Sequence, residues 1–419
     1  MFQTFDATTT PDQGPPRLAA LRQWMAQNQL DGFVVPRADR HQGEYVADCD
    51  ARLAWLTGFT GSAGFACVLH DSAGVFIDGR YRIQVTTQVA QEFTPVHWPE
   101  IKLEDWLKEN AKSGDLIGFD PWLHTVQQIE TARDALDGTD IILTPTANGV
   151  DAIWNDRPLP PATAAWAHPI EMSGQSSRDK IALIANDIKT NGCDAAVITL
   201  PDSICWLLNI RGGDVPCTPI VQSFAVVTAQ GRVALFGDQT KFAPLGPDPL
   251  IDQYEWSDFI DYLGRLEGKI TIDPSSLPFA ALTALRDGTA DIIHKPDPCV
   301  LPKACKNEVE LNGARAAHIR DGAAFVEFLT WFDDQDKTGL TEIDVVKALE
   351  GFRTNTGHLR DISFETISGS GPNAAIVHYR VTDESNRTLD KNNMLLLDSG
   401  GQYVDGTTDI TRTLPIGVP

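Results

Sequence analysis

The chain has 419 residues, of which 42% are hydrophobic and 22% charged, which is ordinary for a globular protein of about three domains. Its 57 acidic and 34 basic residues give a net charge of −23. Nucleic acid and anionic membrane surfaces both require a basic protein surface, so neither is an expected partner. No apolar run approaches the roughly 18–20 residues that span a bilayer.

The N-terminal segment Met1–Pro16 has neither a basic start nor an apolar core. We therefore expect a short, disordered polar lead-in and no secretory signal. The seven cysteines form no CxxC pair. In a chain without an export signal such cysteines are reduced and mostly buried, so we expect a cytoplasmic protein.

The first α/β region extends from about Leu18 to Asp156. It opens with a helical pattern in which Leu18, Leu21, Trp24 and Met25 share one face. A short strand follows, and alternating hydrophobicity predicts two more. These strands are predicted at Asp31–Val35, Ala63–Leu69 and Gly74–Ile77. The stretch Arg157–Pro169 is rich in Pro and Ala, which is typical of a linker.

A second α/β region begins near Ser176 and partly repeats the first. The helical segment Lys180–Cys193 leads into the strand Asp194–Ile198, as the first helix leads into Asp31–Val35. An apolar segment containing a tryptophan follows in both regions. We interpret the two regions as diverged copies of one α/β unit, with chance resemblance as the alternative.

A third region begins near Lys303 with a long helix up to Asp334. Its expected apolar positions are Val309, Ile319, Ala323, Val326 and Phe332. A second helix is predicted to begin at Thr341, where Asp344 completes a variant capping box. Four strand-like runs follow, at Phe364–Ile367, Ala374–Tyr379, Asn393–Asp398 and Asp409–Leu414.

Two aspartates near the C-terminal end are the strongest candidates for chemistry. An apolar strand ends at Asp398, Asp405-Gly406 turns the chain, and a Thr-rich strand carries Asp409. Side chains on neighbouring antiparallel strands approach to about 5 Å, so both carboxylates can share metal ions. Close carboxylates repel, and hard divalent cations such as Mn²⁺ prefer oxygen ligands. The spacing therefore indicates a metal site.

The residues alone leave another interpretation of this segment open. Aspartates at strand ends and in Asp-Gly turns commonly serve turn geometry. His378, at the end of the predicted strand Ala374–Tyr379, favours a catalytic site, although a lone histidine there is more often structural.

Several segments resemble the long, three-domain form of Xaa-Pro aminopeptidase, also called aminopeptidase P. SFETISGSGPNAAIVHYRVT (Ser363–Thr382) and LLLDSGGQYVDGTTDITRT (Leu395–Thr413) are similar to its catalytic "pita-bread" domain, and Lys306–Trp331 is similar to the entry helix of that domain. The segments similar to its first two domains are His41–Gly64, Phe76–Tyr81 and Trp206–Pro216. The resemblance is collinear over nearly the whole chain.

The resemblance implies an α/β chain of two creatinase-N-like domains followed by a partial pita-bread α+β catalytic domain. The expected boundaries are 1–157, 170–302 and 303–419. The implied activity is metal-dependent release of the residue that precedes proline in peptides. The implied cofactor is a pair of divalent metal ions, Mn²⁺ in the family, and the complete protein is expected to be a homodimer.

The resemblance also implies roles for individual residues. Asp398 would be a bidentate ligand of one metal, and Asp409 would bridge both. His378 would position the peptide and assist proton movement at the scissile bond. Thr411 would orient a carboxylate. Arg80 would serve partner contacts or peptide access, although a buried ion pair is the favoured interpretation.

The family's remaining ligands, one histidine and two glutamates, lie downstream of the DITRT segment, as does its general base. This chain ends at Pro419, so we expect a C-terminally truncated sequence that is inactive alone. We also expect the strand carrying Asp409 to be an exposed edge. The alternative functions are a prolidase-like X-Pro dipeptidase and a non-catalytic pita-bread module that binds peptides or proteins.

Overall fold

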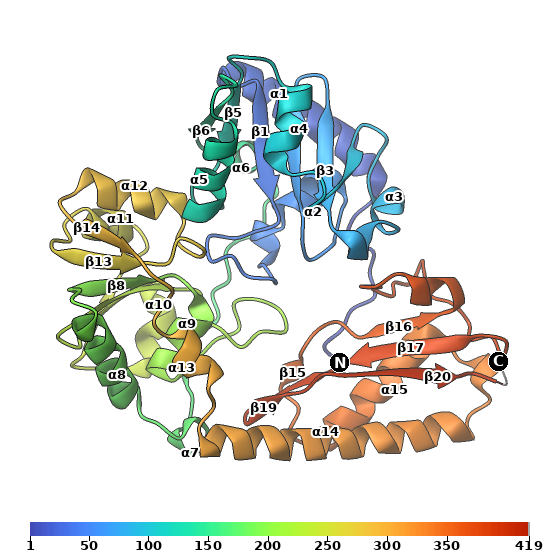
Figure 1. The fold of residues 1–419 in the computed structure, drawn as a ribbon. Coiled ribbons are helices and arrows are strands. Elements are labelled where there is room, and N and C mark those ends of the chain that lie inside the picture. Colours follow the sequence, from blue (N-terminus) through green and yellow to red (C-terminus); the bar gives the residue numbers. More distant parts are fainter. Residues whose placement is uncertain (418–419) are drawn as a thin grey trace. The chain divides into compact units, whose positions relative to one another are not determined.

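The computed structural model describes residues 1–417 and divides into two compact units (Figure 1). Unit 1 comprises Met1–Thr10, Gly79–Thr87 and Asn307–Pro419, and unit 2 comprises Pro11–Asp78 and Gln88–Lys306. These units group segments by contact, so the domain boundaries expected at 157, 170 and 302 stay predictions.

Unit 2 contains two six-stranded sheets with the same topology. The strand order is β4-β3-β2-β1-β5-β6 in the first and β12-β11-β10-β8-β13-β14 in the second. In each, the first strand (β1 or β8) pairs antiparallel with the next (β2 or β10) and parallel with β5 or β13. The other pairs of neighbouring strands also run in the same relative directions in the two sheets. The predicted duplication is therefore confirmed, as is the expected fold class.

The strands of the first sheet, in chain order, are β1 Gly32–Pro36, β2 Phe65–Leu69, β3 Ala73–Ile77, β4 Thr94–His97, β5 Leu116–Phe119 and β6 Ile142–Pro145. Those of the second are β8 Ala195–Ile198, β10 Phe224–Thr228, β11 Val233–Phe236, β12 Ile251–Tyr254, β13 Lys269–Ile272 and β14 Asp291–His294. Strand β7 Trp166–Ala167 lies within the predicted linker and pairs antiparallel with β9 Ile210–Arg211. The helices are α1 Gly14–Gln27, α2 Arg52–Thr57, α3 Val85–Gln88, α4 Leu103–Asn110, α5 Val126–Ala135, α6 Gly149–Ile153, α7 Ile170–Ser173, α8 Ser177–Thr190, α9 Pro201–Leu208, α10 Gln239–Phe242, α11 Asp258–Leu263, α12 Phe279–Asp287 and α13 Val300–Ala304.

The two repeats of unit 2 meet through reciprocal hydrogen bonds at the start of α5 and of α12. The Val126 amide donates to Leu277 O at 3.0 Å, and the Phe279 amide donates to His124 O at 2.9 Å. The first amides of a helix have no acceptor within that helix. Each repeat therefore supplies the carbonyl that the other requires, and the two share one apolar core.

Unit 1 is built on two long helices and two small sheets. The helices are α14 Glu308–Asp334 and α15 Glu342–Asn355. The first sheet, β16-β17-β20, contains β16 Ile367–Ser370, β17 Met394–Ser399 and β20 Ile410–Pro415. The second, β15-β18-β19, contains β15 Asp361–Ile362, β18 Gly401–Tyr403 and β19 Gly406–Thr407. Strand β20 pairs with β17 alone among the described residues, so the expected edge strand is confirmed.

The buried face of α14 differs from the prediction. Phe332 is buried, but Val309, Ile319 and Val326 are 38%, 76% and 60% exposed. The core instead takes Phe325 and Phe328, which pack with aliphatic residues of α15 and β17. Apolar residues occur on several faces of this helix, so periodicity alone cannot select the buried one.

The N-terminal segment is not the disordered lead-in that its composition predicts. It has no regular secondary structure before Pro11, but Met1–Thr10 belongs to unit 1. The Thr366 amide donates to Gln3 Oε1 at 2.8 Å, and Asp383 N donates to Phe5 O at 2.9 Å. The Gln3 side chain and the Phe5 carbonyl therefore tie this segment to the rest of unit 1.

The strand predicted at Ala374–Tyr379 is also wrong. Residues Gly371–Ala375 form a 3-10 helix, and His378 lies in the turn that follows. Gly371 has a φ of +54°, and Pro372 lacks the amide proton that a ladder requires. The chain therefore turns here, where alternating hydrophobicity suggested a strand.

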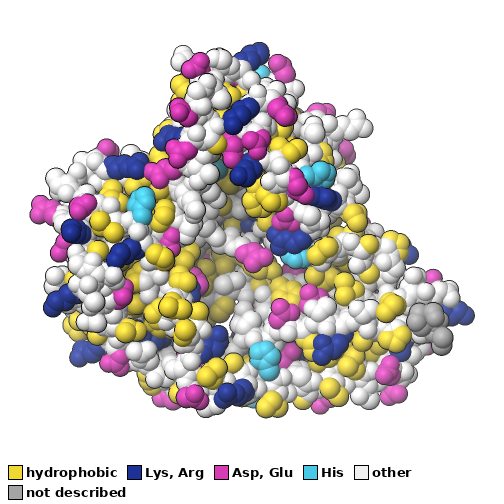
Figure 2. All heavy atoms as spheres, in the orientation of Figure 1, with side chains coloured by type: hydrophobic (Ala, Val, Ile, Leu, Met, Phe, Trp, Pro, Cys, Tyr) yellow, Lys and Arg dark blue, Asp and Glu magenta, His cyan; other side chains and the backbone are white. Residues whose placement is uncertain are grey.

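Among residues 1–417, no helix is both long and apolar enough to cross a bilayer. On the face drawn in Figure 2, basic side chains are interspersed with acidic ones and form no single patch. All seven cysteines are free thiols, and six of them are buried, as predicted.

Candidate metal centre

The two candidate aspartates lie beside the pairing of β17 with β20: Asp398 is in β17, and Asp409 immediately precedes β20. Antiparallel pairing of β17 with β20 places Asp398 opposite Thr411, two residues beyond Asp409. Side chains two residues apart on a strand share a face. The carboxyl groups are near enough that, after partial burial, the charge of Asp398 and a hydrogen bond to it raise the pKa of Asp409. The structure thus brings the predicted pair together.

The hydroxyl of Thr411 donates a hydrogen bond to Asp398 Oδ1 at 2.7 Å. This contact is the one expected of a residue that orients a carboxylate. Thr411 and Asp409 are exposed, and Asp398 is half-buried. Both carboxylates are therefore accessible to a cation from solvent.

A glycine brings the two chain segments close beside the pair. A Cβ at Gly400 would collide with Thr408 O and with Ser363 Oγ. Ser363 Oγ also donates to Thr408 O at 2.9 Å. Only glycine permits this approach, which explains the glycine that follows Asp398-Ser399.

The hairpin between the two aspartates is fixed by a buried ion pair on the helices. Arg353 of α15 forms a bidentate pair with Asp321 of α14 at 2.8 and 3.1 Å, and Tyr403 of β18 donates to Asp321 at 2.7 Å. Burial and the Asp321 carboxylate raise the pKa of Tyr403. At the hairpin turn, Arg320 forms a bidentate pair with Asp405 at 3.0 and 2.9 Å. These contacts were not predicted, since their partners are far apart in the sequence.

His378 contacts a residue from a distant part of the chain. Its Nδ1 lies 2.8 Å from the hydroxyl of Tyr81, with the rings edge to face. Tyr81 lies in the 3-10 helix Gly79–Tyr81, within a segment that belongs to unit 1. Tyr81 ends the family-like segment Phe76–Tyr81, but no role was predicted for it.

The loop that carries His378 is anchored on a buried carboxylate. Glu342 is fully buried at the start of α15 and accepts hydrogen bonds from Ser370 N at 2.6 Å, Asn373 Nδ2 at 2.9 Å and Tyr379 Oη at 3.0 Å. The amide of Arg387 donates to it as well, at 3.2 Å. The capping box of Thr341 and Asp344, predicted for the start of this helix, is confirmed, but these contacts of Glu342 were not predicted. Glu342 lies between these two capping residues, and this position was the only sign in the sequence that it has a structural role.

Arg80 is half-buried, and its guanidinium carbon lies 5.1 Å from the centre of the Tyr81 ring. The ion pair favoured for it from the sequence stays a prediction.

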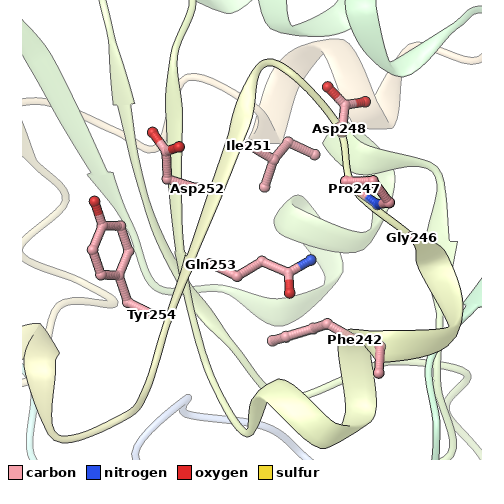
Figure 3. A pocket seen from close by; sticks show the side chains of 9 residues that line it. Phe242, Gly246, Pro247, Asp248, Ile251, Asp252, Gln253 and Tyr254 are labelled. Carbon is pink, nitrogen blue, oxygen red and sulfur yellow. The ribbon is translucent and has the colours of Figure 1, made fainter.

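A recess of about 550 Å³ lies in unit 2, beside β12 (Figure 3). It is lined by Phe242, Ala243, Gly246, Pro247, Asp248 and Ile251–Tyr254. None of the candidate residues lines it, so it gives the predicted chemistry no support.

Within residues 1–417, no three or more His, Cys, Asp or Glu side chains are grouped so that they could hold a metal ion. Asp398 and Asp409 suit a hard divalent cation, since both offer accessible carboxylate oxygens and their mutual repulsion favours a cation between them. They supply part of a ligand set and no more.

Three family models match the chain in sequence order. The Creatinase/Prolidase N-terminal domain matches residues 17–153 and, in a second version, residues 156–310. Metallopeptidase family M24 matches residues 312–419. The chain is therefore built as two creatinase-type α/β domains followed by an M24 metallopeptidase domain.

Curated relatives extend this similarity over nearly the whole chain. A probable Xaa-Pro aminopeptidase P of Talaromyces stipitatus is 37% identical over 96% of this chain and 64% of its own length. One of Aspergillus niger is 35% identical over 96% of this chain and 69% of its own. The chain belongs to the Xaa-Pro aminopeptidase P family.

A solved structure shows the same fold. The X-prolyl aminopeptidase of Caenorhabditis elegans, described as a cytosolic enzyme with a di-nuclear active site, superposes with a TM-score of 0.89 at 29% identity. The match covers 96% of this chain and 70% of that one. The chain thus spans about two thirds of the proteins that it resembles.

The buried ion pair yields a stability prediction for unit 1. Asp321→Asn leaves the Arg353 guanidinium buried without its charged partner, so we expect a loss of about 3–5 kcal/mol in the free energy of unfolding. Urea denaturation measures it. The matched control is Asp333→Asn on the same helix, where the carboxylate is 77% exposed and the loss should stay below about 1 kcal/mol. Equal losses of unfolding free energy in the two variants would contradict a stabilising role for the Asp321–Arg353 pair.

The raised pKa of Asp409 predicts a pH-dependent effect of Asp409→Asn. A carboxyl group whose pKa is raised on folding favours the folded state in acid, and this contribution is lost as pH rises through the folded pKa. Without metal, the variant should therefore be more stable than the wild type at neutral pH, by less than about 1 kcal/mol for an exposed group. The difference should vanish in acid. Thermal unfolding in a chelating buffer measures this, and a variant that is less stable at neutral pH would contradict it.

Proposed function

We propose that the protein is a metal-dependent aminopeptidase that releases the N-terminal residue preceding proline in peptides. The observation that carries the proposal is the closeness of the carboxyl groups of Asp398, in β17, and Asp409, immediately before β20. Membership in the Xaa-Pro aminopeptidase P family supports the substrate class.

Within this proposal, Asp398 and Asp409 hold divalent metal ions, and Thr411 orients Asp398 through its hydrogen bond. Bound metal ions would polarise the scissile carbonyl and stabilise the charge that develops on it. His378 positions the peptide and assists proton movement beside that bond. Among residues 1–417 no group of three or more His, Cys, Asp or Glu side chains is placed to hold a metal ion, so the pair is proposed as part of a larger ligand set.

Two metal ions are proposed because the C. elegans relative has a di-nuclear site. Their identity as Mn²⁺ and a homodimeric assembly rest on the family resemblance. A cytoplasmic location is supported by that cytosolic relative and by the buried free thiols.

Activity is tested with the complete open reading frame that contains these codons. We expect Mn²⁺-dependent release of the first residue from a tripeptide with proline second, and none from its alanine analogue. Asp398→Asn and Asp409→Asn should each lower turnover at least about a hundredfold, because each removes a charged ligand. The matched control is Asp405→Asn, in the same hairpin, which breaks an ion pair with Arg320 and should retain activity within about tenfold.

The same assay separates the alternatives. Cleavage of X-Pro dipeptides without cleavage of the tripeptide would indicate a prolidase-like dipeptidase. Binding of the tripeptide without cleavage would indicate a non-catalytic module. Unchanged turnover in both aspartate variants would overturn the proposed site.

The 419-residue chain should show no X-Pro hydrolysis with added Mn²⁺. Its described residues supply two carboxylates, and such a partial ligand set binds a metal weakly. Release of the first residue, followed by chromatography, checks this expectation. Measurable turnover by this chain would mean that other residues complete the ligand set.

A further inference from the structure

The recess of about 550 Å³ in unit 2 lies beside β12, which is an edge strand of the second sheet among the described residues (Figure 3). It is lined by β12 itself and by residues of the segment 242–248, which precedes that strand. Gln253 points from β12 into the space between them (Figure 3). Binding cavities for small ligands measure roughly 300–1,000 Å³, so this recess is large enough for a few residues of an extended peptide.

The outer side of β12 offers backbone groups for a further strand. β12 pairs in parallel with β11, and Tyr254 O accepts from Gly237 N at 3.1 Å. Backbone groups of successive residues in a strand point to opposite sides, so those of Ile251 and Gln253 point away from β11. The Ile251 amide agrees, since it donates to Asp248 O at 3.1 Å. Among residues 1–417 the Gln253 amide and the carbonyls of Ile251 and Gln253 have no partner strand.

The corresponding edge in the first repeat is closed. Strand β4 pairs in parallel with β3, and Trp98 N donates to Ile77 O at 2.9 Å. By the same alternation, Pro95 and His97 point away from β3. Proline has no amide proton to offer, and the His97 carbonyl already accepts from Ile101 N at 2.8 Å. Two sheets of the same topology therefore differ at this edge, which is blocked in the first repeat and open in the second.

We propose that the outer edge of β12 is a docking site for an extended peptide segment of another protein, which adds a strand along Ile251 and Gln253 and places a basic side chain beside Asp248. This site belongs to unit 2, whereas the proposed metal centre belongs to unit 1. The proposal therefore goes beyond the peptidase function and does not rest on it.

Charge determines the chemistry of the partner. Asp248 is exposed, and its Oδ1 accepts from Leu250 N at 2.8 Å, so Oδ2 remains for a ligand. Asp252 is exposed as well, but it is paired with Arg232 at 2.6 Å. The net charge of −23 attracts a basic segment and repels an acidic one. Main-chain hydrogen bonds to the edge would supply the affinity, and the contact with Asp248 the specificity.

The partner chemistry is tested with the 419-residue chain and a fluorescent peptide, acetyl-Thr-Val-Lys-Val-Thr-amide, by fluorescence anisotropy. We expect saturable binding that is about threefold weaker when glutamate replaces the lysine, the effect of one exposed charge contact. Asp248→Asn should remove this preference. Absence of saturable binding, equal binding of the two peptides, or a preference that Asp248→Asn leaves unchanged would overturn the proposal.

The backbone contact is tested by Gln253→Pro, which gives β12 the kind of residue that β4 has at Pro95. The substitution removes an outward-pointing amide and no hydrogen bond to β11, so the sheet should stay folded. We expect peptide binding to weaken at least about tenfold, the factor for one lost hydrogen bond and a blocked edge. The matched control is Gln253→Ala, which removes the side chain, keeps the amide and should bind like the wild type.

Equal losses of peptide binding in Gln253→Pro and Gln253→Ala would overturn the proposal, because the side chain and not the backbone would then hold the peptide. Sedimentation of the chain alone tests another occupant: self-association that Gln253→Pro abolishes would place a second copy on this edge and overturn the proposal too.

Hydrogen exchange in the wild type decides the matter even if Gln253→Pro fails to fold. With peptide at ten times its dissociation constant, the Gln253 amide should exchange about tenfold more slowly. An unchanged exchange rate overturns the proposal. The peptide-cleavage assay of the complete reading frame is a separate measurement, so failure of either proposal leaves the other standing.

Discussion

Antiparallel pairing of β17 with β20 is the constraint on which the candidate site depends. Residues of a strand alternate between faces, so a slip of one residue would send Asp409 to the face opposite Asp398. The hydrogen bond from Thr411 to Asp398 exists only in the observed register. Because β20 is an edge strand among the described residues, this register relies on one neighbour and on the hairpin that joins the two strands.

Polar anchors, more than apolar packing, fix the segments that carry the candidate residues. The Asp321–Arg353 pair holds the hairpin through Tyr403, and the buried Glu342 holds the loop around His378. A hydrogen-bonded carboxylate accepts few geometries, whereas apolar contacts are non-directional. Such anchors therefore specify the positions of short loops and hairpins that have little core of their own.

Unit 1, which contains the candidate site, is not a contiguous stretch of chain. Unit 1 includes Met1–Thr10 and Gly79–Thr87 as well as the C-terminal residues. These segments contribute the contacts of Gln3 with Thr366 and of Tyr81 with His378. A protein beginning near Asn307 would therefore lack the partners of Thr366, which precedes β16, and of His378, even though the family model of this region begins at residue 312.

The sequence by itself determined the α/β class, the duplicated unit and the proximity of Asp398 and Asp409, because hydrophobic periodicity, turn residues and short spacing are local properties. Tertiary structure decided which face of α14 is buried, since Phe325 and Phe328 compete there with Ile319 and Val326. It also decided that the segment before His378 turns around Glu342 instead of forming a strand. The Tyr81–His378 contact joins residues separated by 297 positions, and no local pattern encodes such a distance.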